Sequence, residues 1–235
     1  MGSSRLPGKV LFDVAGRPAL EWVVRRLQQA KRVDEVVVAT SVDPLDDVLE
    51  QWCGSMGLAV HRGSENDVLG RVVDAHRMMK SDVIVEVTGD CTVLDPELID
   101  TGVVTFLEND CDVVSNTWKP SWPNGINVQV FRFADLEEVA RTIDDPPVRE
   151  HVSLYFYEHP ERYRVFHLFA PARCWGPEYR LSIDYPEDHR LISEIYGRLL
   201  PRYGERFGAE EVIALLHAEP ELWEINRHRV QKSAR

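Results

Sequence analysis

The sequence has little cysteine and no cysteine pair of the kind that binds zinc. No two of its cysteines form a CxxC pair, and all are far apart: they are Cys53, Cys91, Cys111 and Cys174. Zinc sites and disulfide frameworks both require clustered or regularly spaced cysteines. We therefore interpret all of them as free thiols inside the protein, which argues against a disulfide-stapled or zinc-organised fold.

Long apolar runs and an excess of positive charge are also absent. No stretch approaches the roughly 18 consecutive apolar residues of a membrane span, and the start lacks a signal-peptide apolar region. The 39 acidic residues outnumber the 27 Lys and Arg residues, for a formal net charge of −12, whereas nucleic-acid binding needs a basic face. We expect a cytoplasmic protein without a membrane or nucleic-acid partner. A nucleotide is still possible, because a local cationic loop and a divalent metal can hold it.

The 235 residues, of which 44% are hydrophobic, suit a single α/β domain over residues 1–235. Apolar runs predict buried strands at 35–40, 82–87 and 112–115. Helical spacing of apolar residues predicts helices at 18–30, 44–56, 68–79 and 96–107, the first with Arg25 and Arg26 on its outer face. This alternation predicts a Rossmann-like fold with a mainly parallel sheet.

Residues 116–180 break the alternation, beginning with a turn-rich segment that contains Trp118 and Trp122. From there the patterns predict strands near 126–131, 163–169 and 179–183, and helices at 134–142 and 147–158. We interpret this region as a small α+β insertion that carries acceptor-binding and dimer contacts. Helices are then predicted at 186–200, 209–217 and 220–228.

The first nine residues, Met-Gly-Ser-Ser-Arg-Leu-Pro-Gly-Lys, form a small-residue loop with two fixed cations, Arg5 and Lys9. Small residues let backbone N–H groups approach an anion, Arg5 can fork onto phosphate oxygens, and Lys9 supplies a point charge. The pattern is typical of a triphosphate-binding loop. Met-Gly-Ser-Ser also begins many expression tags, but the continuation Arg-Leu-Pro-Gly-Lys belongs to no tag.

Two aspartates follow predicted strands. Asp90 comes after the strand at 82–87, and Asp184 comes after the short strand at 179–183. Open α/β sheets bind ligands at the carboxyl ends of their strands, although either residue could instead cap a turn or a helix. Taken with the cationic loop, the two carboxylates suit Mg²⁺, which takes few protein ligands and completes its shell with water and phosphate oxygens.

Five motifs in order resemble those of the spore-coat polysaccharide cytidylyltransferase family, which is related to the CMP-Kdo and CMP-sialate synthetases. They span nearly the whole chain and are Gly2–Lys9, Arg62–Leu69, Thr88–Cys91, Arg149–His151 and Ile183–Asp188. The resemblance implies a fold of the nucleotide-diphospho-sugar transferase type. It also implies a homodimer that uses Mg²⁺ to transfer CMP from CTP to an acidic acceptor, releasing pyrophosphate.

The resemblance also implies roles for individual residues. The catalytic residues would be Arg5, Lys9, Asp90 and Asp184, and the two aspartates would bind the metal. The residues that bind the CTP phosphates would be Gly2, Ser3, Ser4, Arg5 and Lys9, and Ser64 and Asp67 would lie beside the base and ribose. Arg149 and His151 would face the acceptor or help to build the dimer, although a histidine in that setting is more often a structural hydrogen-bonding residue. Trp118 and Trp122 line an acceptor pocket or cap the insertion.

The chain departs from the family pattern on the acceptor side. Amides stand where the family commonly has acids, at Asn124, Asn127 and Gln129. Because three amides remove negative charge from this side, we hypothesise an acceptor that is more anionic than usual. A phosphonate or a phosphorylated acid fits this description better than a plain sugar acid.

A second departure lies at the start, because relatives carry an apolar strand before the glycine–serine loop and that strand is central in their sheet. Here the first central strand is missing from the sequence. We favour the explanation that Met1 is an internal methionine mistaken for the start; the others are that another segment fills the gap or that the protein is a degraded relative. The alternative functions are a truncated, non-catalytic nucleotide-binding homologue and a sugar-nucleotide-dependent glycosyltransferase, although no Asp-x-Asp triplet follows a suitable strand.

Overall fold

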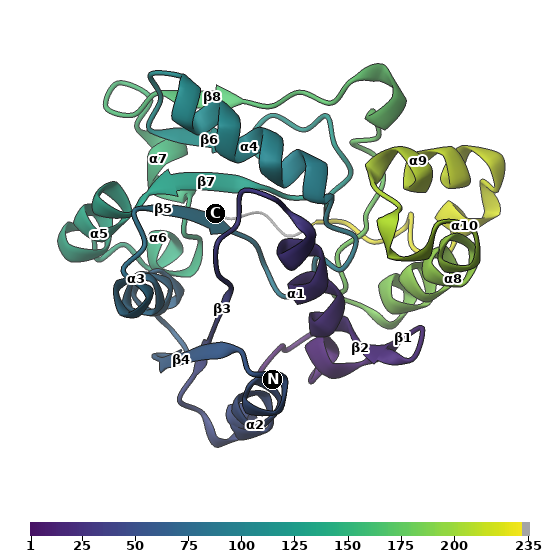
Figure 1. Ribbon diagram of the computed structural model, residues 1–235, viewed down its shortest axis with the longest axis horizontal. Helices are drawn as coiled ribbons and strands as arrows, with labels where there is room; N and C mark the ends of the chain where they lie inside the picture. Colours follow the sequence, from purple (N-terminus) through teal and green to yellow (C-terminus); the bar gives the residue numbers. More distant parts are fainter. Residues whose placement is uncertain (232–235) are drawn as a thin grey trace.

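The computed structural model, which describes residues 1–231, contains two separate sheets, one of β3 and β4 and one of β5 to β8 (Figure 1). The smaller sheet pairs β3 (Val37–Ser41) in parallel with β4 (Ala59–Gly63). The larger sheet has the order β5-β7-β6-β8, with β5 at Val83–Glu86, β6 at Val113–Ser115, β7 at Gln129–Arg132 and β8 at Val165–His167. A short hairpin of β1 (Asp13–Val14) and β2 (Arg17–Pro18) precedes both.

Helices cover both faces of the larger sheet, and loops connect them to the strands. Their bounds are α1 Ala19–Gln29, α2 Asp47–Met56, α3 Val68–Met79, α4 Pro96–Glu108, α5 Phe133–Thr142, α6 Pro146–Glu150, α7 Leu154–Glu158, α8 Pro186–Tyr203, α9 Ala209–Ala218 and α10 Glu221–Glu224. Short 3₁₀ turns occur at Lys9–Leu11, Pro44–Asp46, Ala172–Cys174 and Gly204–Arg206. None of the helices in residues 1–231 is long and apolar enough to cross a bilayer.

Alternation along the strands explains why the sheet is apolar on both sides. Val114 and Val130 enter the core formed with α1, α4, α8 and α9. Their neighbours Val113 and Phe131 enter the opposite core, formed with α3, α5, α6 and α7. Successive side chains of a strand point to opposite faces, so a strand covered on both faces must be apolar at every position. This confirms the interpretation of the run at 112–115 as a buried strand. The runs at 35–40 and 82–87 also form strands, β3 and β5, but most of their side chains are only partly buried.

The helix predictions are largely confirmed, and the larger sheet is mixed: β5, β6 and β8 run in one direction, and β7 is the exception to the predicted mainly parallel sheet. β7 runs antiparallel to both of its neighbours, β5 and β6. The chain returns from β6 to β7 through a turn-rich loop without a helix, so it enters the sheet in the opposite direction. A parallel neighbour normally needs a helical crossover connection. Part of the predicted insertion therefore lies inside the main sheet.

Two further predictions inside the insertion need correction. The helix predicted over 147–158 is divided into α6 and α7. Its buried residues Val152, Leu154 and Phe156 are two positions apart, a spacing that one continuous helix cannot place on a single face.

The strand predicted at 179–183 does not form. This segment is extended but makes only an isolated bridge between Arg180 and Asn124, because its neighbours are loops. Gly125 is required in that contact: its φ is +107°, and a Cβ there would lie 2.4 Å from the carbonyl carbon of Leu181.

The inner edges of β3 and β5 have no strand partner among residues 1–231, since β3 pairs only with β4 and β5 only with β7. A cavity of about 740 Å³ lies between these two edges. The central strand that relatives carry before the glycine–serine loop is expected at this place.

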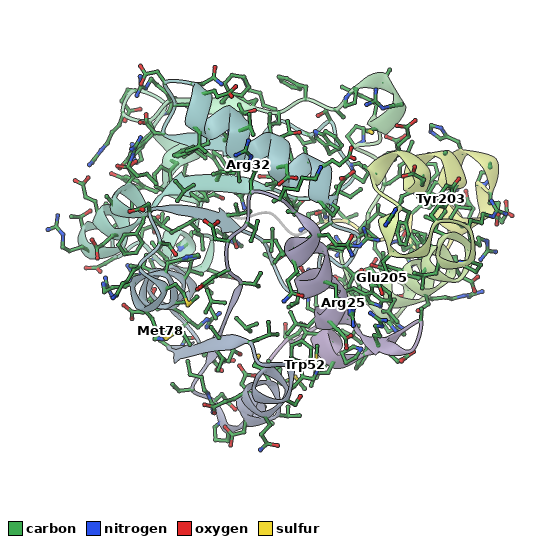
Figure 2. All side chains as sticks on the ribbon, in the orientation of Figure 1. Arg25, Arg32, Trp52, Met78, Tyr203 and Glu205 are labelled. Atoms are coloured by element: carbon green, nitrogen blue, oxygen red, sulfur yellow. The ribbon has the colours of Figure 1, made fainter. Side chains whose placement is uncertain are left out.

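Arg26 faces the interior, and the prediction that it lies on the outer face of the first helix is wrong. Its side chain is 1% exposed and donates hydrogen bonds to the carbonyls of Leu94 (3.0 Å) and Phe207 (2.8 Å) and to the hydroxyl of Tyr196 (3.1 Å). These contacts hold α1 against α8 and the segment after it. Arg25 does face outward, toward Glu205 (Figure 2).

We predict that Arg26→Met destabilises the protein by about 2–4 kcal/mol, because it leaves buried carbonyls without a donor. Arg25→Met is the matched control on the same helix and should cost no more than about 0.5 kcal/mol. Urea unfolding of the three proteins measures both values. Equal effects of the two substitutions would contradict the structural role of Arg26.

Candidate active site

Lys9 holds the two predicted metal-binding aspartates together. Its Nζ donates to Oδ1 of Asp184 at 2.7 Å and also to Oδ2 of Asp90. The backbone brings the aspartates close as well, since the N–H of Ile183 donates to the carbonyl of Asp90 at 3.1 Å. The structure therefore assembles Lys9, Asp90 and Asp184, which are far apart in the sequence, at one point beyond the carboxyl end of β5.

Asp184 is buried among cations. Arg5 Nη2 donates to its Oδ1 at 2.6 Å, and Arg180 Nη2 donates to its Oδ2. Burial alone would raise the pKa of Asp184, but the hydrogen bond from Lys9 and the charges of Lys9, Arg5 and Arg180 hold it below its ordinary value. Burial would likewise lower the pKa of Lys9, yet the charge of Asp90 and its hydrogen bonds to both aspartates raise it. Both groups are therefore charged at neutral pH.

Asp188 fixes the position of Asp184 from the first turn of α8. Its Oδ2 accepts from the backbone N–H groups of Asp184 and Tyr185, each at 2.9 Å. Its Oδ1 accepts from Asn226 at 2.8 Å, and Arg180 Nε lies 3.2 Å from both oxygens. Asp188 lies in the motif Ile183–Asp188, but the sequence assigned no role to Arg180, Asp188 or Asn226. An acid three residues after Tyr185 at a helix start is the capping signal that could have found Asp188.

The loop before Lys9 lies across the carboxyl ends of both sheets. Its amino end is tied to the smaller sheet, because the Met1 ammonium group pairs with Asp46 at 2.5 Å and Asp46 binds Thr40 and Ser41 at the end of β3. Its other end reaches Asp90 through Lys9. A Cβ on Gly2 would lie 2.6 Å from Glu65 Oε1, which is the end of a flexible side chain that can move aside. Ser3 Oγ accepts from the N–H of Leu6 at 3.3 Å, which shapes the loop that Ser4 also belongs to.

The donor set fits a magnesium ion. The carboxylates of Asp90 and Asp184 converge on one ammonium group, so they are close enough to share a cation. Residues 1–231 contain no cluster of three or more His, Cys, Asp or Glu side chains that could hold a metal. Two carboxylates and no nitrogen or sulfur ligand suit Mg²⁺, which takes its remaining ligands from water and phosphate.

The comparisons with known proteins agree with this geometry. The family model described as cytidylyltransferase matches residues 1–212. The chain is 38% identical over 229 residues to the spore coat polysaccharide biosynthesis protein SpsF of Bacillus subtilis, covering 94% of this chain and 92% of that one. The chain belongs to the cytidylyltransferase family.

Solved structures agree on the fold of this cytidylyltransferase. A cytidylyltransferase from Leptospira borgpetersenii superposes with a TM-score of 0.89 at 28% identity, covering 99% of this chain and 95% of that one. A CMP:2-keto-3-deoxy-manno-octonic acid synthetase complexed with CTP has a TM-score of 0.63 at 19% identity, covering 85% and 95%. The α/β nucleotidyltransferase fold, which the chain shares with both of these structures, is therefore confirmed.

A row of polar side chains crosses the larger sheet of the cytidylyltransferase at the level where β5 and β6 end. Glu86 on β5 pairs in register with Gln129 on β7, which pairs with Ser115 on β6. Gln129 donates to Glu86 at 2.8 Å and accepts from the Tyr157 hydroxyl at 2.6 Å, which lies 2.7 Å from Ser115 Oγ. Trp118 stacks on Tyr157 with ring centroids 4.7 Å apart. This places Gln129 and Trp118 in one network, to which sequence reasoning had not assigned Glu86 or Tyr157.

Glu86 is partly buried, and burial raises the pKa of its carboxyl group to about 7, opposed by the hydrogen bond from Gln129 and assisted by the charge of Asp90. The Glu86 carboxyl group therefore ionises close to neutral pH, whereas most carboxyl groups ionise at a much lower pH.

The remaining predicted site residues are distributed around this row. Asn127 Nδ2 lies 3.9 Å from the sulfur of Cys91, next to Asp90. Asn124 donates to Gln231 at 2.8 Å. Trp122 donates to the carbonyl of Leu168 at 2.9 Å and packs on the core, so it supports the insertion.

On the α3 side of the cytidylyltransferase, Asp67 caps the helix through the N–H of Gly70 (2.9 Å) and pairs with Arg149. The carbonyl of Ser64 accepts from Arg71 at 2.7 Å, in the loop before Asp67. His151 is partly buried at the end of α6, where its N–H donates to Pro147. Nucleotide or acceptor binding by Ser64, Asp67, Arg149 and His151 stays a prediction.

We predict that the stability of the wild type falls, relative to Glu86→Gln, as the pH rises from 5 to 8. The unfolded chain loses this proton near pH 4.5 and the folded protein near pH 7, so the folded state binds more protons in between and is weakened as they leave. The relative loss should be on the order of 2 kcal/mol. Urea unfolding at both pH values measures it, with the exposed Glu97→Gln as control. A pH-independent difference would contradict the assignment.

Proposed function

We propose that this cytidylyltransferase transfers CMP from CTP to an acidic acceptor in an Mg²⁺-dependent reaction that releases pyrophosphate. The observation that carries the proposal is the cluster in which Lys9 contacts Asp90 and Asp184 and Arg5 contacts Asp184. These are the cations and the carboxylates that a triphosphate and its metal would need. The loop also supplies backbone N–H groups from small residues, which suit phosphate oxygens.

The residues of the cluster would change partners when substrate binds. Asp184 is fully engaged in the structure, with Arg5 and Lys9 on Oδ1 and Arg180 on Oδ2. Arg5 and Lys9 can turn to the phosphates, since both lie on the loop, whereas Arg180 is buried beneath Asp184. Asp90 and Asp184 would then hold Mg²⁺. When bound, the ion neutralises phosphate charge and helps to orient the triphosphate.

Transfer of the nucleotidyl group needs little covalent help from the protein. An acceptor oxygen attacks the α-phosphorus in line, and pyrophosphate leaves. Arg5 and Lys9 would offset the charge that develops on the leaving group, and Gly2, Ser3 and Ser4 would position the phosphates through their backbone N–H groups. The rigid support of Asp184 by Asp188 keeps one side of the site preorganised.

The acceptor would lie against the polar row that contains Gln129. In this row the uncharged Gln129 amide contacts the Glu86 carboxyl group. The pKa of Glu86 is raised to about 7, so this carboxyl group is mostly protonated and uncharged below pH 7. Asn127 contacts Cys91, the residue that follows Asp90. This low negative charge favours a strongly anionic acceptor, such as a phosphonate or a phosphorylated acid, over a sugar acid.

Membership of the family favours nucleotidyl transfer over the glycosyltransferase alternative. The non-catalytic alternative is kept because β3 and β5 each have an unpaired edge within residues 1–231. The homodimer also stays a prediction. Its support is a group of exposed aromatic side chains on the 116–180 region, namely Phe166, Phe169 and Trp175, and sedimentation velocity would test it.

We predict that Asp90→Asn lowers kcat for pyrophosphate release from CTP by about 100-fold or more, because it removes a charged metal ligand. Asp184→Asn should have a similar effect, with circular dichroism to check that this buried residue still permits folding. The control is Asp110→Asn, because Asp110 is an exposed aspartate that pairs with Arg164 and does not contact Asp90 or Asp184. Full turnover by both site variants would exclude the metal assignment. CTP binding by the wild type without any turnover would favour the non-catalytic homologue.

The acceptor class gives a separate prediction. With CTP and Mg²⁺, phosphonates or phosphorylated acids should show a kcat/KM at least about tenfold above that of sugar acids, because anions avoid added negative charge. Gln129→Glu should reduce this preference by placing a carboxylate in the polar row. Turnover with sugar acids only would refute the hypothesis while leaving cytidylyl transfer intact.

A further inference from the structure

Two hydrogen-bond donors beside Asp184 converge on one oxygen atom. Asn124 Nδ2 donates to the side-chain oxygen of Gln231 at 2.8 Å, and Arg180 Nη1 donates to the same oxygen. A guanidinium group has no acceptor atom, so the atom that faces it must be the oxygen of Gln231, and Asn124 must present its NH₂ group. We call the place that this oxygen occupies the paired-donor position.

The backbone holds the two donors in a fixed relation. Asn124 and Arg180 stand opposite each other in an isolated parallel bridge. On one side of the bridge the N–H of Asn124 donates to the carbonyl of Tyr179 at 3.0 Å, and on the other the N–H of Leu181 donates to the carbonyl of Asn124 at 2.6 Å. The two residues therefore stay side by side whether or not an oxygen lies between their side chains.

Arg180 has one nitrogen to spare for a ligand. Its Nη2 donates to Asp184, and its Nε lies 3.2 Å from both carboxylate oxygens of Asp188. Among residues 1–231, Nη1 binds no carboxylate and has only the uncharged amide oxygen as its partner. Hydrogen bonds between charged groups are roughly twice as strong as those to neutral ones. An anionic oxygen would therefore be a better partner for this buried guanidinium group than the amide is.

The present occupant comes from an exposed segment that can leave. Gln231 is exposed, and Val230 before it is 82% exposed. The segment is anchored upstream by Asn226, which is fully buried, and by Arg229, which pairs with Glu187 at 2.7 Å. Figure 1 shows the chain after α10 running back toward the larger sheet. Gln231 can therefore swing away from the paired-donor position while the anchor stays in place.

We propose that Asn124 and Arg180 form a subsite for an anionic oxygen of the acceptor substrate, and that Gln231 closes this subsite when the substrate is absent. The anion is a carboxylate, phosphonate or phosphate group, and its oxygen replaces that of Gln231. The group lies on the Nη1 side of Arg180, whose Nη2 side holds Asp184. The identity of the ligand as the acceptor substrate rests on the proposed function, whereas binding of an anion at this place does not require CTP.

The test is a titration of the protein with methylphosphonate in the absence of CTP, followed by NMR at the side-chain amide of Asn124. The amide signals should shift and saturate. Gln231→Ala should lower the Kd at least about threefold, because the competing oxygen is removed. Gln231→Glu should raise the Kd at least about tenfold, because its carboxylate occupies the position more strongly. The control is Gln51→Glu, the same charge change on the exposed face of α2, which should leave the Kd unchanged.

A substitution of the donor itself completes the binding test. Asn124→Asp should raise the Kd of methylphosphonate at least about tenfold, because an ionised carboxylate cannot donate and repels the anion; for this variant the Kd is measured by calorimetry. The same titration with acetate distinguishes a phosphonate or phosphate ligand from a carboxylate by the tighter of the two. Absence of a saturable shift at Asn124 would overturn the proposal. A Kd that none of the substitutions changes would also overturn it, and would place the anion at the loop of Arg5 and Lys9.

Turnover gives a second measurement that separates the subsite from the reaction. In the pyrophosphate-release assay, Gln231→Glu should raise the KM of the acceptor substrate at least about fivefold and leave the KM of CTP unchanged, because the two substrates occupy different places. An equal rise of both KM values would overturn the assignment to the acceptor substrate. The expected pattern of methylphosphonate binding without turnover by any of the proteins would refute the proposed function and still support the anion subsite.

Discussion

The contact of Lys9 with Asp90 and Asp184 is the interaction on which the site depends. Each of the three groups is buried or partly buried, and a buried charge is tolerated only when its partners are present. The same contact anchors the loop that begins at Met1 and spans the carboxyl ends of β3 and β5. Because no strand joins these two ends within residues 1–231, the loop and the flanking helices set their separation. The chemistry of the site and the alignment of the two sheets therefore rest on one set of charges.

The charged residues of the site could be predicted because each has a local signature. Asp90 follows an apolar run, and Arg5 and Lys9 stand among glycine and serine. Their supporting residues could not be predicted in the same way. Asn226 reaches Asp188 from 38 positions away, and no local pattern in the sequence indicates that these two residues pair. Glu86 looked like an ordinary strand end, and only the register with Gln129 shows that it belongs to the polar row.

The predictions of the fold show the same difference between features set by nearby residues and features set by distant ones. Periodic apolar spacing located α1, α3 and α8 to within a few residues, since a helix is determined by nearby contacts. The direction of β7 was not predicted, because it depends on which strand the chain meets after a loop rather than on the strand's own residues. The prediction that Arg26 faces outward was wrong for a related reason. A charged residue at an outward-looking position can turn inward when carbonyls from distant segments, here Leu94 and Phe207, accept its hydrogens.

The charge balance at Asp184 also limits how the site can respond to its ligands. Three cations, Arg5, Lys9 and Arg180, contact this one carboxylate, and the pKa shifts of Lys9 and Asp184 both favour their charged forms. Proton transfer within the cluster is therefore unfavourable at neutral pH. In the proposed reaction, Arg5 and Lys9 would turn from Asp184 to the triphosphate. Arg180 is held by Asp188, so Asp184 would keep this buried cation on one oxygen while its other oxygen became available to the metal. This asymmetry would let one aspartate serve both the resting and the substrate-bound site.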